Sequence, residues 1–174
     1  MAAPWEEDDT PHTSTIAPWD VYAYRESGSA KAIKGIESGG RYNALGPVTR
    51  TGDRAYGRDQ VMGKNVGPWS QAALGYAMTP DEFLNDPYAQ DAVFAHRFGA
   101  YERKYGPEGA ARAWFAGEGG MNDLSRQDQL GTSVGEYSRR FVASRGGESQ
   151  APASATRAPW DEDVSLSSGS SPLS

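Results

Sequence analysis

The chain has 174 residues, of which 37% are apolar and 23% charged, so its length and composition fit one domain of ordinary size with tails. It contains no cysteine and two distant histidines, His12 and His96, which leaves little material for disulfides, a thiolate or histidine metal centre, or a Ser-His-Asp triad. The net charge of −6 divides into −5 over residues 1–20, +2 over residues 21–145 and −3 over residues 146–174, which argues against nucleic acid as the main ligand and would tolerate an anionic polymer.

The sequence shows neither an apolar run of about 18 residues nor a basic segment followed by an apolar one. We therefore expect no membrane span and no secretory signal peptide. Because thiols are absent and the histidines lie far apart, we also expect no metal and no cofactor.

The two ends of the chain differ in composition from its middle. Residues 1–20 are acidic and proline-rich, and residues 146–174 are dominated by Ser, Gly, Pro and Ala, so we expect two tails, the first extended or disordered, around a domain over residues 21–145. The motif Ala-Pro-Trp-acid occurs three times in these tails, with its indoles at Trp5, Trp19 and Trp160. It is either a chance product of low complexity or a docking motif that binds a larger assembly or folds back on its own domain.

The first predicted helix ends at Glu37. Ser27 or Ser29 can cap its beginning, and a glycine pair after Ser38 ends it. Apolar residues recur along it at helical spacing, so Glu37 points roughly where the buried side chains point. Burial raises the pKa of a carboxyl, as a general acid working near neutral pH requires. The alternative is a helix-terminal glutamate in water with no task.

The next segment is predicted to contain a flap and two short helices. Turn residues and β-branched side chains over residues 41–54 indicate a loop or a short hairpin. A second helix is expected from near Gly57 to about Asn65, and a third from Gly67-Pro68 through Leu74.

Two helix-start signals follow. Thr79-Pro80 and Asp86-Pro87 each place a capping residue before a proline at the first helical position. The apolar stripe after the second signal continues to Tyr105 and is ended by Gly106, which predicts the longest helix of the chain. His96 lies on this helix, where a structural or surface role is the ordinary interpretation.

Two further helices are predicted after this one. Pro107 starts a helix through Phe115, and Ser133 with Glu136 forms a capping box for a last helix to about Ser144. The total is five or six helices and no strand pattern that could form a sheet. The sequence therefore predicts a mainly α fold.

Four motifs occur along the chain in a fixed order: Glu37-Ser38-Gly39-Gly40, Tyr56-Gly57-Arg58-Asp59-Gln60-Val61-Met62-Gly63, Ala113-Trp114-Phe115-Ala116-Gly117 and Tyr137-Ser138-Arg139-Arg140-Phe141-Val142. This set resembles the lytic transglycosylase family of the lysozyme superfamily, over roughly residues 30–143. The family pattern is Glu-Ser with glycines, Gly-Leu-Met-Gln, Ala-Tyr-Asn-Ala-Gly, and a late Tyr before Arg-Val. The order of the four motifs is more specific than any single motif.

The resemblance implies a lysozyme-like helical globule with a small β-like flap beside a cleft, and a single catalytic glutamate, here Glu37. This residue would protonate the oxygen between N-acetylmuramic acid and N-acetylglucosamine and then act as base on the muramic 6-hydroxyl. The product is a 1,6-anhydro sugar. The residues that the resemblance assigns to substrate binding or placement are Ser38, Gln60, Met62, Trp114, Phe115 and Tyr137.

Among these residues, Tyr137 matches the tyrosine that orients the catalytic carboxylate, and Gln60 matches a glutamine expected to hydrogen-bond a sugar. Phe115 departs from the family because it replaces Asn and cannot make amide hydrogen bonds. Asp59 departs because the family places an apolar side chain there. A carboxylate at this position would raise the pKa of Glu37 if close, or would face solvent.

The leading interpretation is a peptidoglycan lytic transglycosylase. One alternative is a non-catalytic glycan-binding or structural protein on the same fold. Another is a hydrolytic muramidase, which needs a second carboxylate such as Asp53 or Asp59, although Asp53 is expected to be a turn residue. If Glu37 is not the proton donor, Glu118 is the next candidate.

The cellular context is inferred from three features together: the missing leader, the exposed tryptophan motifs and the cell-wall chemistry. They favour a bacteriophage virion protein that opens the bacterial cell wall, in the periplasm, for DNA ejection. Its partners would be glycan strands and, through Trp5, Trp19 and Trp160, virion proteins. A bacterial enzyme of a secretion apparatus is the competing interpretation.

Overall fold

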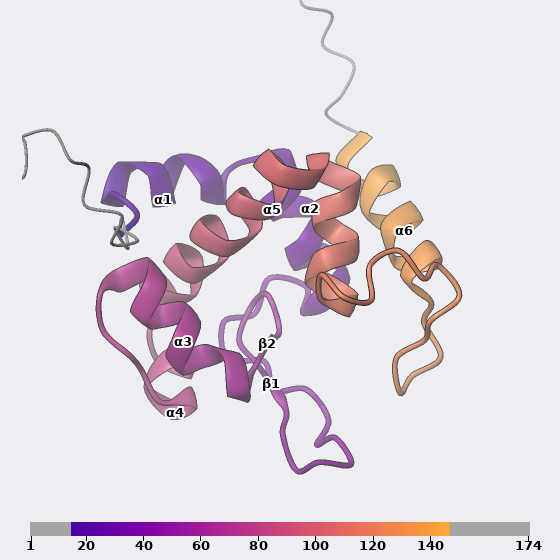
Figure 1. Cartoon of the computed structure of the whole chain (residues 1–174). Helices are drawn as coiled ribbons and strands as arrows, with labels where there is room; N and C mark the ends of the chain where they lie inside the picture. The colour runs from indigo at the N-terminus through magenta and orange to yellow at the C-terminus, as the bar shows by residue number, and fades with distance from the viewer. Residues whose placement is uncertain (1–14, 147–174) are drawn as a thin grey trace, which may run out of the picture.

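The structure, a computed structural model, describes residues 15–146. Within this range the protein is a mainly helical globule of six helices with one two-stranded antiparallel sheet (Figure 1). The elements are α1 (Pro18–Arg25), α2 (Gly28–Glu37), β1 (Ala55–Tyr56), β2 (Val61–Met62), α3 (Gly63–Leu74), α4 (Pro80–Leu84), α5 (Pro87–Ala116) and α6 (Val134–Gly146). The prediction of a mainly α fold is confirmed. No helix in this range is long and apolar enough to cross a membrane.

Helix α5 is the element against which the other five helices pack. Asp86 caps its start by accepting a hydrogen bond of 2.9 Å from the N–H of Ala89, as the Asp86-Pro87 signal predicted. Gly106, with φ 73° and ψ 171°, breaks the helical geometry, and the helix resumes at Pro107. Figure 1 shows the change of direction along α5. The expected end at Gly106 and restart at Pro107 are confirmed as a kink.

The buried side chains form two clusters. The first joins α2, α5 and α6 around Phe98 and Phe141, and the second joins α3, α4, β2 and the start of α5 around Phe83. Since the first cluster holds α2 against α6, it also fixes the position of Glu37, the last residue of α2.

The predicted caps of three other helices are present. Ser27, and not Ser29, caps α2 by accepting a hydrogen bond of 3.1 Å from the N–H of Ala30. Thr79 forms a complete capping box at the start of α4. Of the capping box predicted for α6, one bond is seen: Ser133 accepts a hydrogen bond of 3.1 Å from the N–H of Glu136. Helix α6 then runs to Gly146, slightly beyond the expected end.

The prediction of two helices over residues 57–65 and 67–74 is wrong. Residues 57–60 form a turn, because Gly57 and Gln60 take φ angles of 78° and 53°, which an α-helix does not allow. A single helix, α3, then continues through Pro68. Val66, before this proline in the sequence, and Ala73, after it, are both buried. Packing of this continuous face of α3 maintains the helix across Pro68.

The small flap exists, but its strands lie further along the chain than residues 41–54. Ala55 pairs with Met62 and Tyr56 with Val61, and a bridge joins Leu45 to Tyr56. The reason is that the residues with positive φ at 57 and 60 close the tight turn between these strands. In Figure 1 the loop that precedes β1 projects from the body of the protein.

Residues 18–20 were expected to belong to the N-terminal tail, but they form the first turn of α1. Pro18 occupies the first helical position, and buried Val21 attaches the helix to the core. Trp19 is 72% exposed. Trp5 and Trp160 lie outside the described residues.

Candidate active site

A cavity of about 370 Å³ opens at the C-terminal end of α2. Five of the predicted site residues line it: Glu37, Ser38, Gln60, Phe115 and Tyr137. They come from α2, the residue after it, the turn between β1 and β2, the end of α5 and α6. The structure thus brings together parts of all four sequence motifs.

Glu37 is half-buried in the wall of this cavity, and its Oε1 accepts a hydrogen bond from the hydroxyl of Tyr137. Burial raises the pKa of Glu37 from 4.5 to about 7. The bond from Tyr137 acts in the opposite direction, and the negative charges of Asp59 and Asp128 add to the increase. A carboxyl with this pKa can both donate and accept a proton near neutral pH.

Tyr137 is a buried hydrogen-bond donor. It lies on the face of α6 that packs into the first core cluster, and it is 3% exposed. Burial, and then the nearby charge of Glu37, raise the pKa of Tyr137 well above its usual value. The hydroxyl therefore keeps its proton and orients the carboxyl of Glu37 at any physiological pH.

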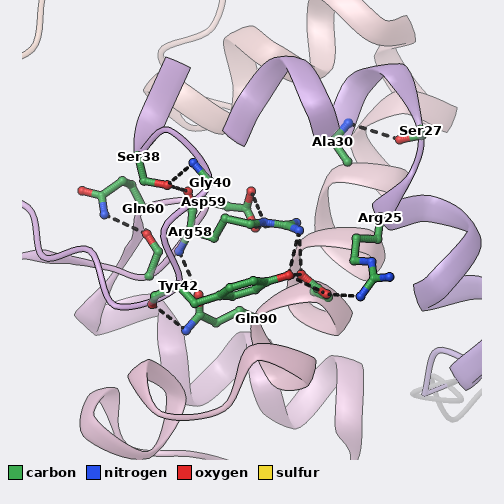
Figure 2. A network of polar contacts seen from close by, with 12 residues as sticks. Arg25, Ser27, Ala30, Ser38, Gly40, Tyr42, Arg58, Asp59, Gln60 and Gln90 are labelled. Atoms are coloured by element: carbon green, nitrogen blue, oxygen red, sulfur yellow. Dashed lines mark hydrogen bonds and ion pairs between the residues drawn. The ribbon is translucent and has the colours of Figure 1, made fainter. Parts of the chain in front are cut away.

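Ser38 uses its hydroxyl within the protein. Its Oγ donates a hydrogen bond of 2.6 Å to the carbonyl of Arg58 and accepts bonds of 3.1 Å from the N–H groups of Gly40 and Arg41. Figure 2 shows the bonds of Ser38 to Gly40 and Arg58. Together the three bonds fix the chain directly after Glu37. The geometry favours a placing role for Ser38 over a substrate contact.

Gln60 presents its side chain to the cavity from the tight turn of the hairpin. Its Nε2 donates a hydrogen bond of 2.9 Å to the carbonyl of Gly57, so one N–H of the side-chain amide is already bonded within the protein. Phe115 covers another wall of the cavity and stacks on the ring of Tyr137, with 4.5 Å between the ring centroids.

Trp114 and Met62 do not line this cavity. The indole of Trp114 packs in the core against the rings of Phe94 and Phe98, and its Nε1–H donates a hydrogen bond of 3.3 Å to the carbonyl of Asp59. Trp114 is therefore placed to support the site from behind. Met62, the last residue of β2, lies beside the hairpin turn.

Asp128 lines the same cavity as Glu37 and was not predicted from the sequence. Its Oδ1 accepts hydrogen bonds of 2.9 Å from the N–H groups of Leu130 and Thr132, within a loop closed by a bridge between Gln127 and Ser133. In the sequence, Asp128 before Gly131 indicates an ordinary turn. A turn signal does not indicate that the residue will share a cavity with Glu37 of α2. Arg41 and Arg140 also line the cavity and were not predicted.

The other carboxylates that the sequence offered as candidates, Asp53, Asp59 and Glu118, do not line this cavity. Asp53 directly follows the turn at residues 50–52, its Oδ1 accepts a bond of 2.8 Å from the N–H of Arg54, and it does not line the cavity. Asp59 does not face solvent, because it is buried beside Arg58. Glu118 is exposed, pairs with Lys104 at 3.0 Å and does not line the cavity.

Among residues 15–146 no three His, Asp or Glu side chains gather as they would around a metal ion. Comparison of the chain with protein-family models, with curated proteins and with solved structures finds no match.

Proposed function

We propose that the protein is a peptidoglycan lytic transglycosylase with Glu37 as its proton-transferring group. The observation that carries the proposal is the state of this residue: a half-buried carboxyl with a pKa near 7, bonded to a buried tyrosine, in the wall of a cavity. The order of the four sequence motifs, and their meeting at this cavity, support it. A lysozyme-like fold is part of the proposal, supported by the helical core and the hairpin beside the cavity.

The reaction needs one group that first donates and then retrieves a proton. Protonated Glu37 gives its proton to the oxygen between N-acetylmuramic acid and N-acetylglucosamine as the bond from C1 breaks. The carboxylate then takes the proton of the muramic 6-hydroxyl as that oxygen bonds to C1. No water is consumed, and Glu37 ends in its starting state. Tyr137 holds the carboxyl in one orientation through both steps.

A hydrolytic muramidase is the second candidate, and Asp128 is the observation that favours it. Two carboxylates in one cleft are the usual equipment for glycoside hydrolysis, as in lysozyme. Asp128 lines the same cavity as Glu37. It would then activate water or stabilise the sugar cation. A glycan-binding protein without cleavage remains the non-enzymatic alternative.

We further propose that the protein is carried by a virion and acts on the cell wall in the periplasm. The support is the repeated Ala-Pro-Trp-acid motif and the 72% exposure of Trp19, the one of its three tryptophans that the structure describes. An exposed indole beside Asp20 suits a partner pocket with a basic rim. Replacing Trp5, Trp19 and Trp160 by Ala should abolish incorporation into the assembly and leave sacculus cleavage unchanged; normal incorporation of the triple variant would contradict the docking role.

The experiment that separates these functions is digestion of purified sacculi followed by mass analysis of the soluble products. A transglycosylase releases 1,6-anhydromuropeptides, which are lighter by one water molecule than the reducing muropeptides that a hydrolase releases. A glycan-binding protein sediments with sacculi and releases nothing.

A further inference from the structure

A buried ion-pair network lies beside Ser38 and Gln60, two residues of the candidate site (Figure 2). The guanidinium of Arg58 is placed between two carboxylates: its Nη2 is 3.0 Å from Oδ2 of Asp59, and its Nη1 is 2.8 Å from Oδ1 of Asp91. All three side chains are buried. Tyr42 closes the network at the surface, where its hydroxyl lies 3.0 Å from the carboxylate of Asp91.

The main chain of Arg58 connects this network to the candidate acid. Its N–H donates a hydrogen bond of 2.8 Å to Oε1 of buried Gln90 on α5, and its carbonyl accepts the 2.6 Å bond from Ser38. Ser38 is the residue that follows Glu37. A displacement of Arg58 would therefore be transmitted through one hydrogen bond to the end of α2.

The same residues hold the hairpin turn that carries Gln60 into the cavity. Gln60 has a φ of 53°, the one positive value outside glycine within the described residues. At Gly57 an added Cβ would lie 2.2 Å from Oε1 of Gln90, so the backbone approaches this side chain as only glycine permits. Backbone strain of this kind persists only where contacts with the surrounding structure hold the strained conformation in place.

Stability alone is a poor explanation for these charges. Removing ions from water costs several kcal/mol for each ion, and apolar residues of similar volume often serve a core equally well. What apolar residues cannot supply is a negative charge near Glu37. Asp59 provides that charge, whereas Asp91 is not among the groups whose charge acts on Glu37.

We propose that Asp59 is a positioning residue for Glu37: paired with Arg58 it fixes the hairpin turn and, through the bond between Arg58 and Ser38, the chain directly after the acid, and it places a buried carboxylate near Glu37. This inference rests on the proposed function. The groups that act on Glu37 are Tyr137, Asp59 and Asp128, and those that act on Asp59 are Arg58, Asp91 and Lys34. Burial raises the pKa of Asp59 to about 6, whereas the charge and hydrogen bonds of Arg58 lower it and so favour the ionised carboxylate.

The test compares Asp59→Asn with the matched variant Asp91→Asn, which removes a carboxylate from the same guanidinium. The pKa of Glu37 is measured by NMR titration of the ¹³C-labelled carboxyl, assigned with Glu37→Gln, beside thermal melts and the pH profile of sacculus cleavage. Asp59→Asn should lower the pKa of Glu37 by about one unit and reduce cleavage above neutral pH about tenfold, with KM unchanged. Asp91→Asn should lower the melting temperature similarly and leave the pKa of Glu37 in place.

Equal shifts of the Glu37 pKa in the two variants, or no shift of this pKa in Asp59→Asn, would overturn the inference. If Asp59→Asn does not fold, titration of the ¹³C-labelled carboxyl of Asp59 in the wild type decides: an Asp59 that is ionised at the pH where Glu37 titrates supports the inference, and an Asp59 that is protonated there overturns it. A wild-type protein that leaves sacculi intact would refute the proposed function, while the NMR titration would still report on Asp59.

Discussion

The hydroxyl of Tyr137 donates a hydrogen bond to Oε1 of Glu37 and thereby joins two residues that are 100 positions apart in the sequence. The bond joins α6 to the end of α2 at the wall of the cavity. It stabilises the ionised form of Glu37, while burial favours the protonated form more strongly. The balance leaves the pKa of this carboxyl near 7, where one residue can act as acid and then as base.

Tyr137→Phe removes this hydrogen bond and keeps the stacked ring. We predict that cleavage of sacculi slows roughly tenfold to thousandfold, the range usual for a lost orienting or charge-stabilising bond. Because the bond lowers the pKa of Glu37, its loss should also move the falling limb of the pH profile to higher pH. Tyr101→Phe, a buried tyrosine of the same core cluster outside the cavity, is the control. An unchanged rate in Tyr137→Phe would make Tyr137 a core aromatic only.

The raised pKa of Glu37 predicts that the stability of the fold depends on pH. Its folded-state pKa of about 7 lies above the ordinary 4.5, so the folded state binds this proton more tightly than the unfolded state does. The contribution of Glu37 to the free energy of unfolding is therefore complete below about pH 4.5 and is lost as pH rises towards 7. Glu37→Gln removes this pH dependence of the free energy of unfolding. The melting temperature of the variant should therefore rise relative to that of the wild type between about pH 4 and about pH 8. A constant difference across that range would contradict the raised pKa.

Much of the fold follows from local signals in the sequence. Asp86 before Pro87, Thr79 before Pro80 and the break at Gly106 each act within one or two helical turns, so the sequence alone predicts them. Glu37 was predictable for a similar reason, since the spacing of apolar residues along α2 shows which face is buried.

The rest depended on contacts between distant segments. The local chemistry of Pro68 favours a helix start, but packing of α3 keeps the helix continuous through it. Asp128 lines the same cavity as Glu37 because segments far apart in the sequence meet there, and no local pattern predicts that contact. The same limit applies to Asp59, whose burial depends on Arg58 and on Asp91 of α5.

Asp128→Asn tests the role of the second carboxylate in the cavity. The amide oxygen can still accept the N–H groups of Leu130 and Thr132, so the loop should survive. Since the charge of Asp128 raises the pKa of Glu37, its loss should move the falling limb of the pH profile to lower pH, with anhydro products unchanged. Asp123→Asn, an exposed turn residue that does not line the cavity, is the control. Loss of all cleavage in Asp128→Asn alone would instead favour the hydrolytic mechanism.

Phe98→Ala should destabilise the protein by about 3–5 kcal/mol, the usual range for a fully buried phenylalanine. The centroid of its ring lies 4.9 Å from that of Phe94 and 5.9 Å from that of Phe141, so its removal would leave a void where α5 packs against α6. Chemical denaturation measures the change. A loss below about 1 kcal/mol would mean that this cluster does not hold the two helices together.

The central claim is that Glu37 alone transfers the proton in glycan cleavage, and its most direct test is mass analysis of the products released from purified sacculi by the wild type and by Glu37→Gln. The amide keeps the shape of the side chain and can still accept the bond from Tyr137, but it cannot donate and retrieve a proton. We predict anhydromuropeptides from the wild type and no soluble products from Glu37→Gln, although the variant still binds sacculi. Release by Glu37→Gln within about tenfold of the wild-type rate would contradict the account and assign the proton to another group.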